Sequence, residues 1–172
     1  MARLFVHVEG ETEERFVNQV LRDYLVARGF ERVDARLLGN ARQRDRRGGI
    51  RGWNTVRREI IRHLSEDIGC IATTMVDYYG LPQAGEKAWP GRADATSLPV
   101  PSRGPRVQAA LLEDLARDIE RHRFIPFVVE KLVPEYQKPL FGNRAAVEIG
   151  LDTIRAECPH LASWLDRLEA LA

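Results

Sequence analysis

The chain has 172 residues, of which 44% are hydrophobic, and its formal net charge at pH 7 is +1. A chain of this length can bury one substantial core, so we expect residues 1–172 to form a single domain. No apolar stretch approaches the length of a membrane span, and the two cysteines lie far apart, which excludes a transmembrane protein and a disulfide scaffold and predicts a cytoplasmic protein.

The first predicted elements are a strand and a helix. Residues 4–8 form a β-branched and aromatic run that alternates between two faces, as strands do. After an acidic turn, Thr12 is placed to cap a helix with one apolar face, and Gly29 is placed to end it. The first strand therefore delivers the acidic turn, residues 9–13, to the edge of the sheet.

The next segments repeat this order. Residues 32–38 alternate loosely and predict a second strand, which a polar loop follows from Gly39 to Trp53. Asn54 or Thr55 then opens a helix that Gly69 closes. The continuous apolar and β-branched run of residues 70–76 predicts a buried central strand, and Asp77 follows it directly.

The second half of the chain begins with residues 80–104, which are rich in glycine, proline and small polar residues. We expect a long loop here, either functional or partly disordered. Pro105 is placed to start a third helix. Residues 124–129 predict a fourth strand, which lies at a sheet edge or carries a bulge because Pro126 cannot donate a ladder hydrogen bond. Two more helices make up a helical C-terminal part at 143–172, one over residues 143–157 and one over residues 159–171.

The alternation of strands and helices predicts an α/β fold with a mostly parallel, four-stranded sheet flanked by helices, similar to Rossmann-like folds. Functional groups in such sheets gather at the carboxyl ends of the strands. Glu9 and Asp77 both occupy that position, so we expect the fold to bring these two carboxylates to the same edge.

Glu9 and Asp77 are suited to a metal site. Magnesium usually takes one or two carboxylates from the protein and completes its shell with water and phosphate. Gly10 would let the chain turn tightly and let a phosphate approach the first helix. Three other acidic residues of this turn complement the positive end of the helix dipole, although for the first of them a functional role is equally open: Glu11, Glu13 and Glu14.

The turn Val8-Glu9-Gly10-Glu11-Thr12-Glu13, between a strand and a helix, resembles the first motif of the TOPRIM domain. Type IA and II topoisomerases, bacterial primases and overcoming-lysogenization-defect (OLD) nucleases share that domain. Residues 73–82, Thr-Thr-Met-Val-Asp-Tyr-Tyr-Gly-Leu-Pro, and residues 123–127 resemble an uncharacterised bacterial family with a TOPRIM-like domain of unknown function. The resemblance extends from Arg3 to about Phe141.

The resemblance implies a magnesium-dependent nuclease, or another phosphodiester-processing enzyme, with Mg²⁺ or Mn²⁺ as its cofactor. It gives Glu9 a role in metal binding or proton transfer and Asp77 a role in metal binding. It also implies a separately encoded ATPase as a partner in phage or plasmid defence. Tyr79 stands where the superfamily has a second aspartate, and Glu130 or Glu135 is the candidate for a third carboxylate.

Eight arginines lie between residues 42 and 62, against only Asp45 and Glu59. They suit contact with nucleic-acid phosphates, and a solvated loop in an arginine-rich chain is an equally open interpretation. Five of them are our candidate nucleic-acid ligands: Arg42, Arg44, Arg46, Arg47 and Arg51.

Two other functions stay open beside the enzyme. A catalytically impaired binding or regulatory module would use the arginine loop without metal. Alternatively, the apolar face of the last helix, residues 161–168, would dock onto a partner protein. His7 shares the predicted face of Glu9, and it either orients that carboxylate or makes a local hydrogen bond within the strand.

Overall fold

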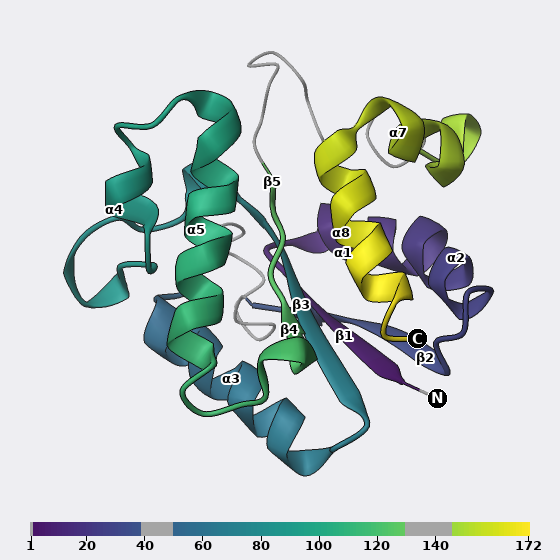
Figure 1. The fold of residues 1–172 in the computed structure, drawn as a ribbon, viewed down its shortest axis with the longest axis horizontal. Coiled ribbons are helices and arrows are strands. Elements are labelled where there is room, and N and C mark those ends of the chain that lie inside the picture. Colours follow the sequence, from purple (N-terminus) through teal and green to yellow (C-terminus); the bar gives the residue numbers. More distant parts are fainter. Residues whose placement is uncertain (1, 39–49, 130–145) are drawn as a thin grey trace.

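The computed structural model of the protein describes residues 2–38, 50–129 and 146–172 (Figure 1). Its centre is a parallel sheet in the order β2-β1-β3-β4, with a short further strand, β5, that also pairs with β3. The strands are β1 (Arg3–Val8), β2 (Arg32–Leu37), β3 (Cys70–Asp77), β4 (Phe124–Ile125) and β5 (Val128–Val129). The predicted α/β fold with a mostly parallel, Rossmann-like sheet is confirmed.

Helices connect the strands and cover both faces of the sheet. The first helical segment consists of α1 (Glu11–Phe16), a π-helical turn (Val17–Leu21) and α2 (Arg22–Val26). The later helices are α3 (Trp53–Glu66), α4 (Arg92–Ala95), α5 (Val100–Leu115), α7 (Leu151–Glu157) and α8 (Pro159–Glu169). Short 3₁₀ turns span Tyr78–Gly80, Gly85–Lys87 and Arg121–Arg123.

Two hydrophobic cores lie on opposite faces of the sheet. Helices α3, α4 and α5 cover one face, and α1, α2, α7 and α8 cover the other (Figure 1). Side chains alternate between the faces along β1, so Leu4 and Val6 join the core beneath α8 while Phe5 packs on the side of α3. The sheet is therefore the middle layer of three, and its carboxyl edge is left for the loops after β1 and β3.

Pro126 divides the fourth strand into β4 and β5. This strand lies at the edge of the sheet, as the sequence predicted. The Thr74 hydroxyl accepts a hydrogen bond from the Phe127 amide at 3.0 Å and donates to the Phe127 carbonyl at 3.2 Å. The Thr73 hydroxyl donates to the carbonyl of Ile125. Two threonine side chains of β3 thus replace ladder hydrogen bonds where the proline interrupts the strand.

The first and third helices begin at other residues than predicted. The first helix begins at Glu11 with Gly10 as its N-cap residue, and the Gly10 carbonyl accepts the first intrahelical hydrogen bond, so Thr12 lies within the first turn. The third helix begins at Val100 and contains Pro105 within it. A proline is tolerated in the first turn of a helix, where its missing N–H needs no partner, so Pro101 starts this helix one turn earlier than expected.

The same difference shortens the expected loop at 80–104, which also contains α4 and the 3₁₀ turn Gly85–Lys87. Near the C-terminus, Gly150 has a φ of +82° and separates helical residues 146–149 from α7. The single helix predicted over residues 143–157 is therefore interrupted, because this left-handed conformation cannot continue an α-helix.

The last helix, α8, packs onto its own sheet. Leu161, Trp164, Leu165 and Leu168 are each at most 7% exposed and belong to the core beneath α8. The indole of Trp164 donates to the Thr73 hydroxyl at 2.9 Å. The hypothesis that this apolar face docks onto a partner protein is therefore wrong, because the fold itself buries it.

Candidate functional site at the carboxyl edge of the sheet

Glu9 and Asp77 meet at the carboxyl edge of the sheet. Glu9 directly follows β1, and Asp77 is the last residue of the neighbouring strand β3. The backbone amide of Asp77 donates a hydrogen bond to Oε2 of Glu9 at 3.2 Å. The side chain of one candidate metal ligand is thus fixed to the main chain of the other.

The strand register explains why this contact joins a side chain to a backbone. Val8 pairs with Met75 in the parallel ladder, so Glu9 and Asp77 are one step out of register with each other. Because side chains alternate along a strand, Glu9 follows the face of His7, whereas Asp77 follows the face of Met75. The carboxylate of Glu9 therefore reaches the end of β3 at its main chain.

The 3₁₀ turn Tyr78–Gly80 completes this edge. Oδ1 of Asp77 accepts a hydrogen bond from the Tyr79 amide at 3.2 Å and so caps the turn. A Cβ atom at Gly80 would lie only 2.9 Å from Oε1 of Glu9, which is closer than real Cβ contacts allow. Gly80 is therefore the residue that makes room for the Glu9 carboxylate, a role that the sequence alone did not reveal.

Tyr79 and Tyr78 have different surroundings within this turn. Tyr79, at the position of the superfamily's second aspartate, is 51% exposed. Tyr78 is 1% exposed and contacts the buried guanidinium of Arg92 through both its carbonyl and its hydroxyl. In the string Asp-Tyr-Tyr-Gly-Leu-Pro, the aspartate thus caps the 3₁₀ turn and the first tyrosine is anchored by Arg92. The second tyrosine exposes its ring, and the glycine leaves space for Glu9.

The acidic first turn of α1 lies next to this site. Glu11, Glu13 and Glu14 are all in that turn, where carboxylates complement the positive end of the helix. Gly10 has a φ of −152°, which is extended backbone that any residue adopts. The backbone conformation at this position therefore does not require glycine.

His7 is completely buried, and its two ring nitrogens contact β3 and α3. Its Nδ1 lies 3.2 Å from the carbonyl of Thr73, and its Nε2 lies 3.2 Å from Nδ1 of His63. Because a carbonyl only accepts, we assign the proton of neutral His7 to Nδ1, so that Nε2 accepts from His63. Burial lowers the pKa of His7 to about 3, and nearby His63 and Arg36 act in the same direction. The expected local hydrogen bond is not the one observed, because these contacts join His7 to the neighbouring strand β3 and to α3.

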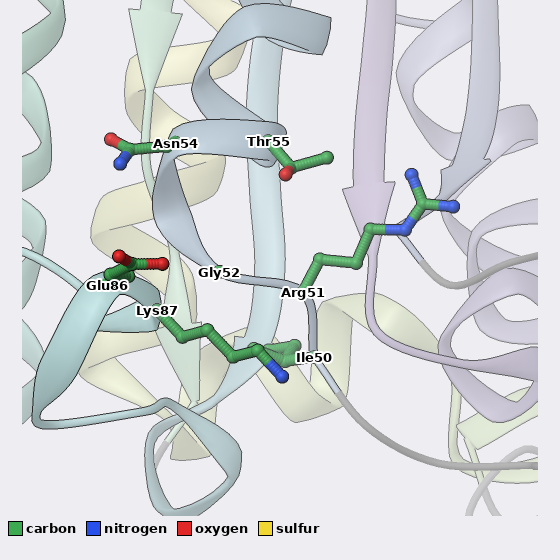
Figure 2. A pocket seen from close by; sticks show the side chains of 7 residues that line it. All are labelled: Ile50, Arg51, Gly52, Asn54, Thr55, Glu86 and Lys87. Carbon is green, nitrogen blue, oxygen red and sulfur yellow. The ribbon is translucent and has the colours of Figure 1, made fainter.

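A pocket of about 740 Å³ opens at the same edge of the sheet (Figure 2). It lies where α3 begins, and this end of α3 is at the carboxyl edge because the other end leads directly into the start of β3. The pocket's polar lining comes from the start of α3 and from the 3₁₀ turn Gly85–Lys87, namely from Arg51, Asn54, Thr55, Glu86 and Lys87. Of these, Lys87 is a functional candidate that sequence reasoning missed, because its nearness to α3 depends on the fold.

Arg51 and Lys87 differ in how they line the pocket. The guanidinium of Arg51 forms an ion pair with Glu59 at 2.9 Å, and its side chain extends away from Lys87 in Figure 2. Lys87 crosses the pocket toward Ile50, with its backbone packed against Gly52, where a Cβ would lie 2.9 Å from the Lys87 Cα. Lys87 therefore supplies a cation to the pocket, while Arg51 is partly neutralised.

Several predicted site residues lie outside the described residues, namely Arg42, Arg44, Arg46, Arg47, Glu130 and Glu135. Within the described ranges, no group of three or more His, Cys, Asp or Glu side chains is arranged to hold a metal ion. Glu9 and Asp77 are therefore the acidic pair on which a metal hypothesis depends. Across those same ranges, no helix has the length and apolar character needed to cross a bilayer.

The chain belongs to the protein family described as domain of unknown function (DUF4276), which matches residues 8–131 and 128–169. The predicted resemblance to an uncharacterised domain family is thereby confirmed, and the match includes Glu9, Asp77 and Gly80. No curated protein and no solved structure matches the chain.

Proposed function

We propose that this DUF4276 protein binds a divalent cation, Mg²⁺ or Mn²⁺, through Glu9 and Asp77 and cleaves or forms phosphodiester bonds in nucleic acid. The observation that supports the proposal is the hydrogen bond from the Asp77 amide to the Glu9 carboxylate, which holds both residues at the carboxyl edge. Ligands in parallel α/β sheets bind at this edge.

The carboxylate oxygens of Glu9 and Asp77 are donors of the kind that a magnesium ion prefers. Mg²⁺ prefers oxygen ligands and usually takes one or two carboxylates from a protein. A carboxylate has about four lone-pair positions, so a hydrogen bond from a backbone amide is compatible with metal coordination. A bound ion would supply neutralisation of charge on the transferring phosphoryl oxygens and a water of lowered pKa.

The chain's own residues would hold and orient the substrate. Glu9 and Asp77 would fix the ion, and Gly80 would leave room for the carboxylate of Glu9. The pocket beside α3 presents Lys87 at the same edge, where a cation favours the entry of a phosphate chain. The arginines of residues 42–47, the third carboxylate Glu130 and a separately encoded ATPase complete the proposal, on the basis of the resemblance to TOPRIM and OLD nucleases.

A second candidate function is a nucleic-acid-binding or regulatory module without catalysis. Tyr79 occupies the position of a second aspartate, and its exposed phenol is a poor magnesium ligand. This module would bind nucleic acid equally well with or without a chelator, whereas the enzyme would need the ion.

Nicking of supercoiled plasmid and of single-stranded RNA with Mg²⁺ or Mn²⁺ tests the proposal. We expect activity in the wild type and its loss in Glu9→Gln and Asp77→Asn, which retain size while removing charge. Glu14→Gln, in the neighbouring turn, is the matched control and should remain active. Activity that survives both substitutions, or chelation, would refute the assignment.

A further inference from the structure

We propose that Arg92 is a positioning residue that fixes Asp77 and Gly80 around the Glu9 carboxylate, an inference that rests on the proposed function of that site. Arg92 lies at the start of α4 and is only 9% exposed. Its side chain contacts Tyr78, which lies between Asp77 and Gly80, the two residues of this turn that lie next to the Glu9 carboxylate.

The guanidinium of Arg92 holds Tyr78 at both ends. Its Nε donates to the backbone carbonyl of Tyr78 at 3.1 Å, and its Nη1 donates to the phenolic oxygen at 2.9 Å. Its central carbon also lies 4.0 Å from the centroid of the Tyr78 ring. One rigid planar group thus fixes the main chain and the ring of the same residue, which a lysine ammonium cannot reproduce.

The partners of Arg92 are unusual for a buried charge. Besides Tyr78, Nη1 donates to the Thr96 hydroxyl at 3.0 Å, and within the described residues Arg92 forms no ion pair with a carboxylate. Burying a charge with neutral acceptors alone costs free energy, so a hydrophobic residue would serve the core better. This arrangement indicates that Arg92 serves to fix the geometry of Tyr78.

The rest of the fold holds Arg92 in place. Gly91 has a φ of +73°, and a Cβ there would lie 2.8 Å from the Cβ of Ala110, so α4 is pressed closely onto α5. Figure 1 shows α4 beside the first half of α5. The ion pair between Arg106 and Asp94, at 2.8 Å, also spans these helices, but it is exposed and contributes little to this support. A rigid support therefore extends from α5 through Arg92 to Tyr78.

Tyr78 transmits this support to the candidate site on both sides. The amide of the preceding residue, Asp77, donates a hydrogen bond to Glu9, and Gly80, two residues later, leaves the space that the Glu9 carboxylate occupies. Ligands that are held in place before a metal arrives lose less freedom on binding, which raises affinity. Loss of Arg92 should therefore loosen the site without removing any atom from it.

Hydrogen exchange of the Asp77 amide, measured without metal, tests the support directly. We expect Arg92→Lys to lower the protection of Asp77 relative to that of Val6 in the middle of β1, by up to about tenfold, which is the effect of losing one net hydrogen bond. Arg106→Lys, on the exposed ion pair, is the matched control and should leave this ratio unchanged. An unchanged ratio in Arg92→Lys would overturn the inference.

Titration with Mn²⁺ supplies the second measurement. Arg92→Lys and Tyr78→Phe should bind Mn²⁺ about tenfold more weakly than the wild type, and Arg106→Lys should bind it equally. If the wild type binds no Mn²⁺, the proposed function fails, and the exchange experiment still decides the role of Arg92. If Arg92→Lys binds Mn²⁺ as tightly as the wild type, Arg92 is merely structural.

Discussion

The amide of Asp77 donates to the carboxylate of Glu9 across 3.2 Å, so the end of β3 is tied to the side chain that follows β1. This contact joins residues that are 68 positions apart, and it depends on the parallel pairing of two adjacent strands. A substitution that moves the Glu9 carboxylate should therefore be felt at the end of β3.

Gly80→Ala should displace the Glu9 carboxylate. The added Cβ would lie 2.9 Å from Oε1, which is the far end of a flexible side chain, so the carboxylate must move while the fold loses little stability. We expect weaker metal binding and little change in urea denaturation. Gly10→Ala is the matched control, because its Cβ would make only an ordinary contact at 3.5 Å from Glu13. Equal effects of the two substitutions would contradict this account of Gly80.

Lys87→Gln should weaken binding of nucleic acid through the pocket beside α3. Each phosphate that a cation neutralises contributes about 0.7–0.9 to the slope of log affinity against log salt concentration. We expect the slope to fall by about that amount for one contact, measured by fluorescence anisotropy with a labelled oligonucleotide. Arg62→Gln removes an exposed cation near the opposite end of α3 and should leave the slope unchanged. A lower slope for Arg62→Gln and an unchanged slope for Lys87→Gln would exclude the pocket as a phosphate contact.

Thr74→Val should destabilise the divided strand at Pro126. The substitution keeps the shape of the side chain but removes both hydrogen bonds to the backbone of Phe127, and an unsatisfied buried amide costs about 1–3 kcal/mol. Thr74→Ser retains the hydroxyl and should lose less. A valine variant as stable as the wild type in urea denaturation would show that these hydrogen bonds do not matter.

Stability should fall as the pH is lowered from 7 to 5, because His7 is buried in its neutral form. Burial lowers its pKa to about 3 in the folded protein, below the ordinary value of 6.5, so only the unfolded chain takes up a proton in this range. The stabilisation is complete above pH 6.5 and declines toward pH 3. The loss for this group between pH 7 and pH 5 is about 2 kcal/mol, at about 1.4 kcal/mol per unit.

Comparison with His7→Asn isolates this contribution. The pKa of His63 is also lowered, chiefly by burial, so the variant should retain a smaller dependence of the same sign. Urea denaturation at a series of pH values measures the difference. An identical pH dependence in the wild type and in His7→Asn would contradict the assignment of a neutral buried His7.

The features that depend on local pattern could be predicted from the sequence. The alternation of strands and helices predicted the parallel sheet, and the missing N–H of Pro126 predicted that the fourth strand lies at a sheet edge. Asp77 and Glu9 could be placed at one edge because the carboxyl ends of parallel strands coincide. The boundary of α5 could not, because Pro101 and Pro105 are both acceptable as helix starts and packing against α4 decides between them.

The contacts that shape the candidate site depend on packing between distant segments. Nothing in the sequence distinguishes Arg92 among the 23 arginines, and only the fold brings it to Tyr78. Lys87 and Arg51 line one pocket because the segment after β3 packs against the start of α3. The contact between buried His7 and half-buried His63 likewise follows from the position of α3 on β1.

The most direct test of the central claim is the effect of Mn²⁺ or Mg²⁺ on the melting temperature of the wild type, Glu9→Gln and Asp77→Asn. A cation that binds only the folded protein raises stability by about 2.7 kcal/mol at 100 times its dissociation constant. We expect a concentration-dependent rise for the wild type and none for either variant. The same rise in all three proteins, or no rise in the wild type, would contradict a metal site at Glu9 and Asp77.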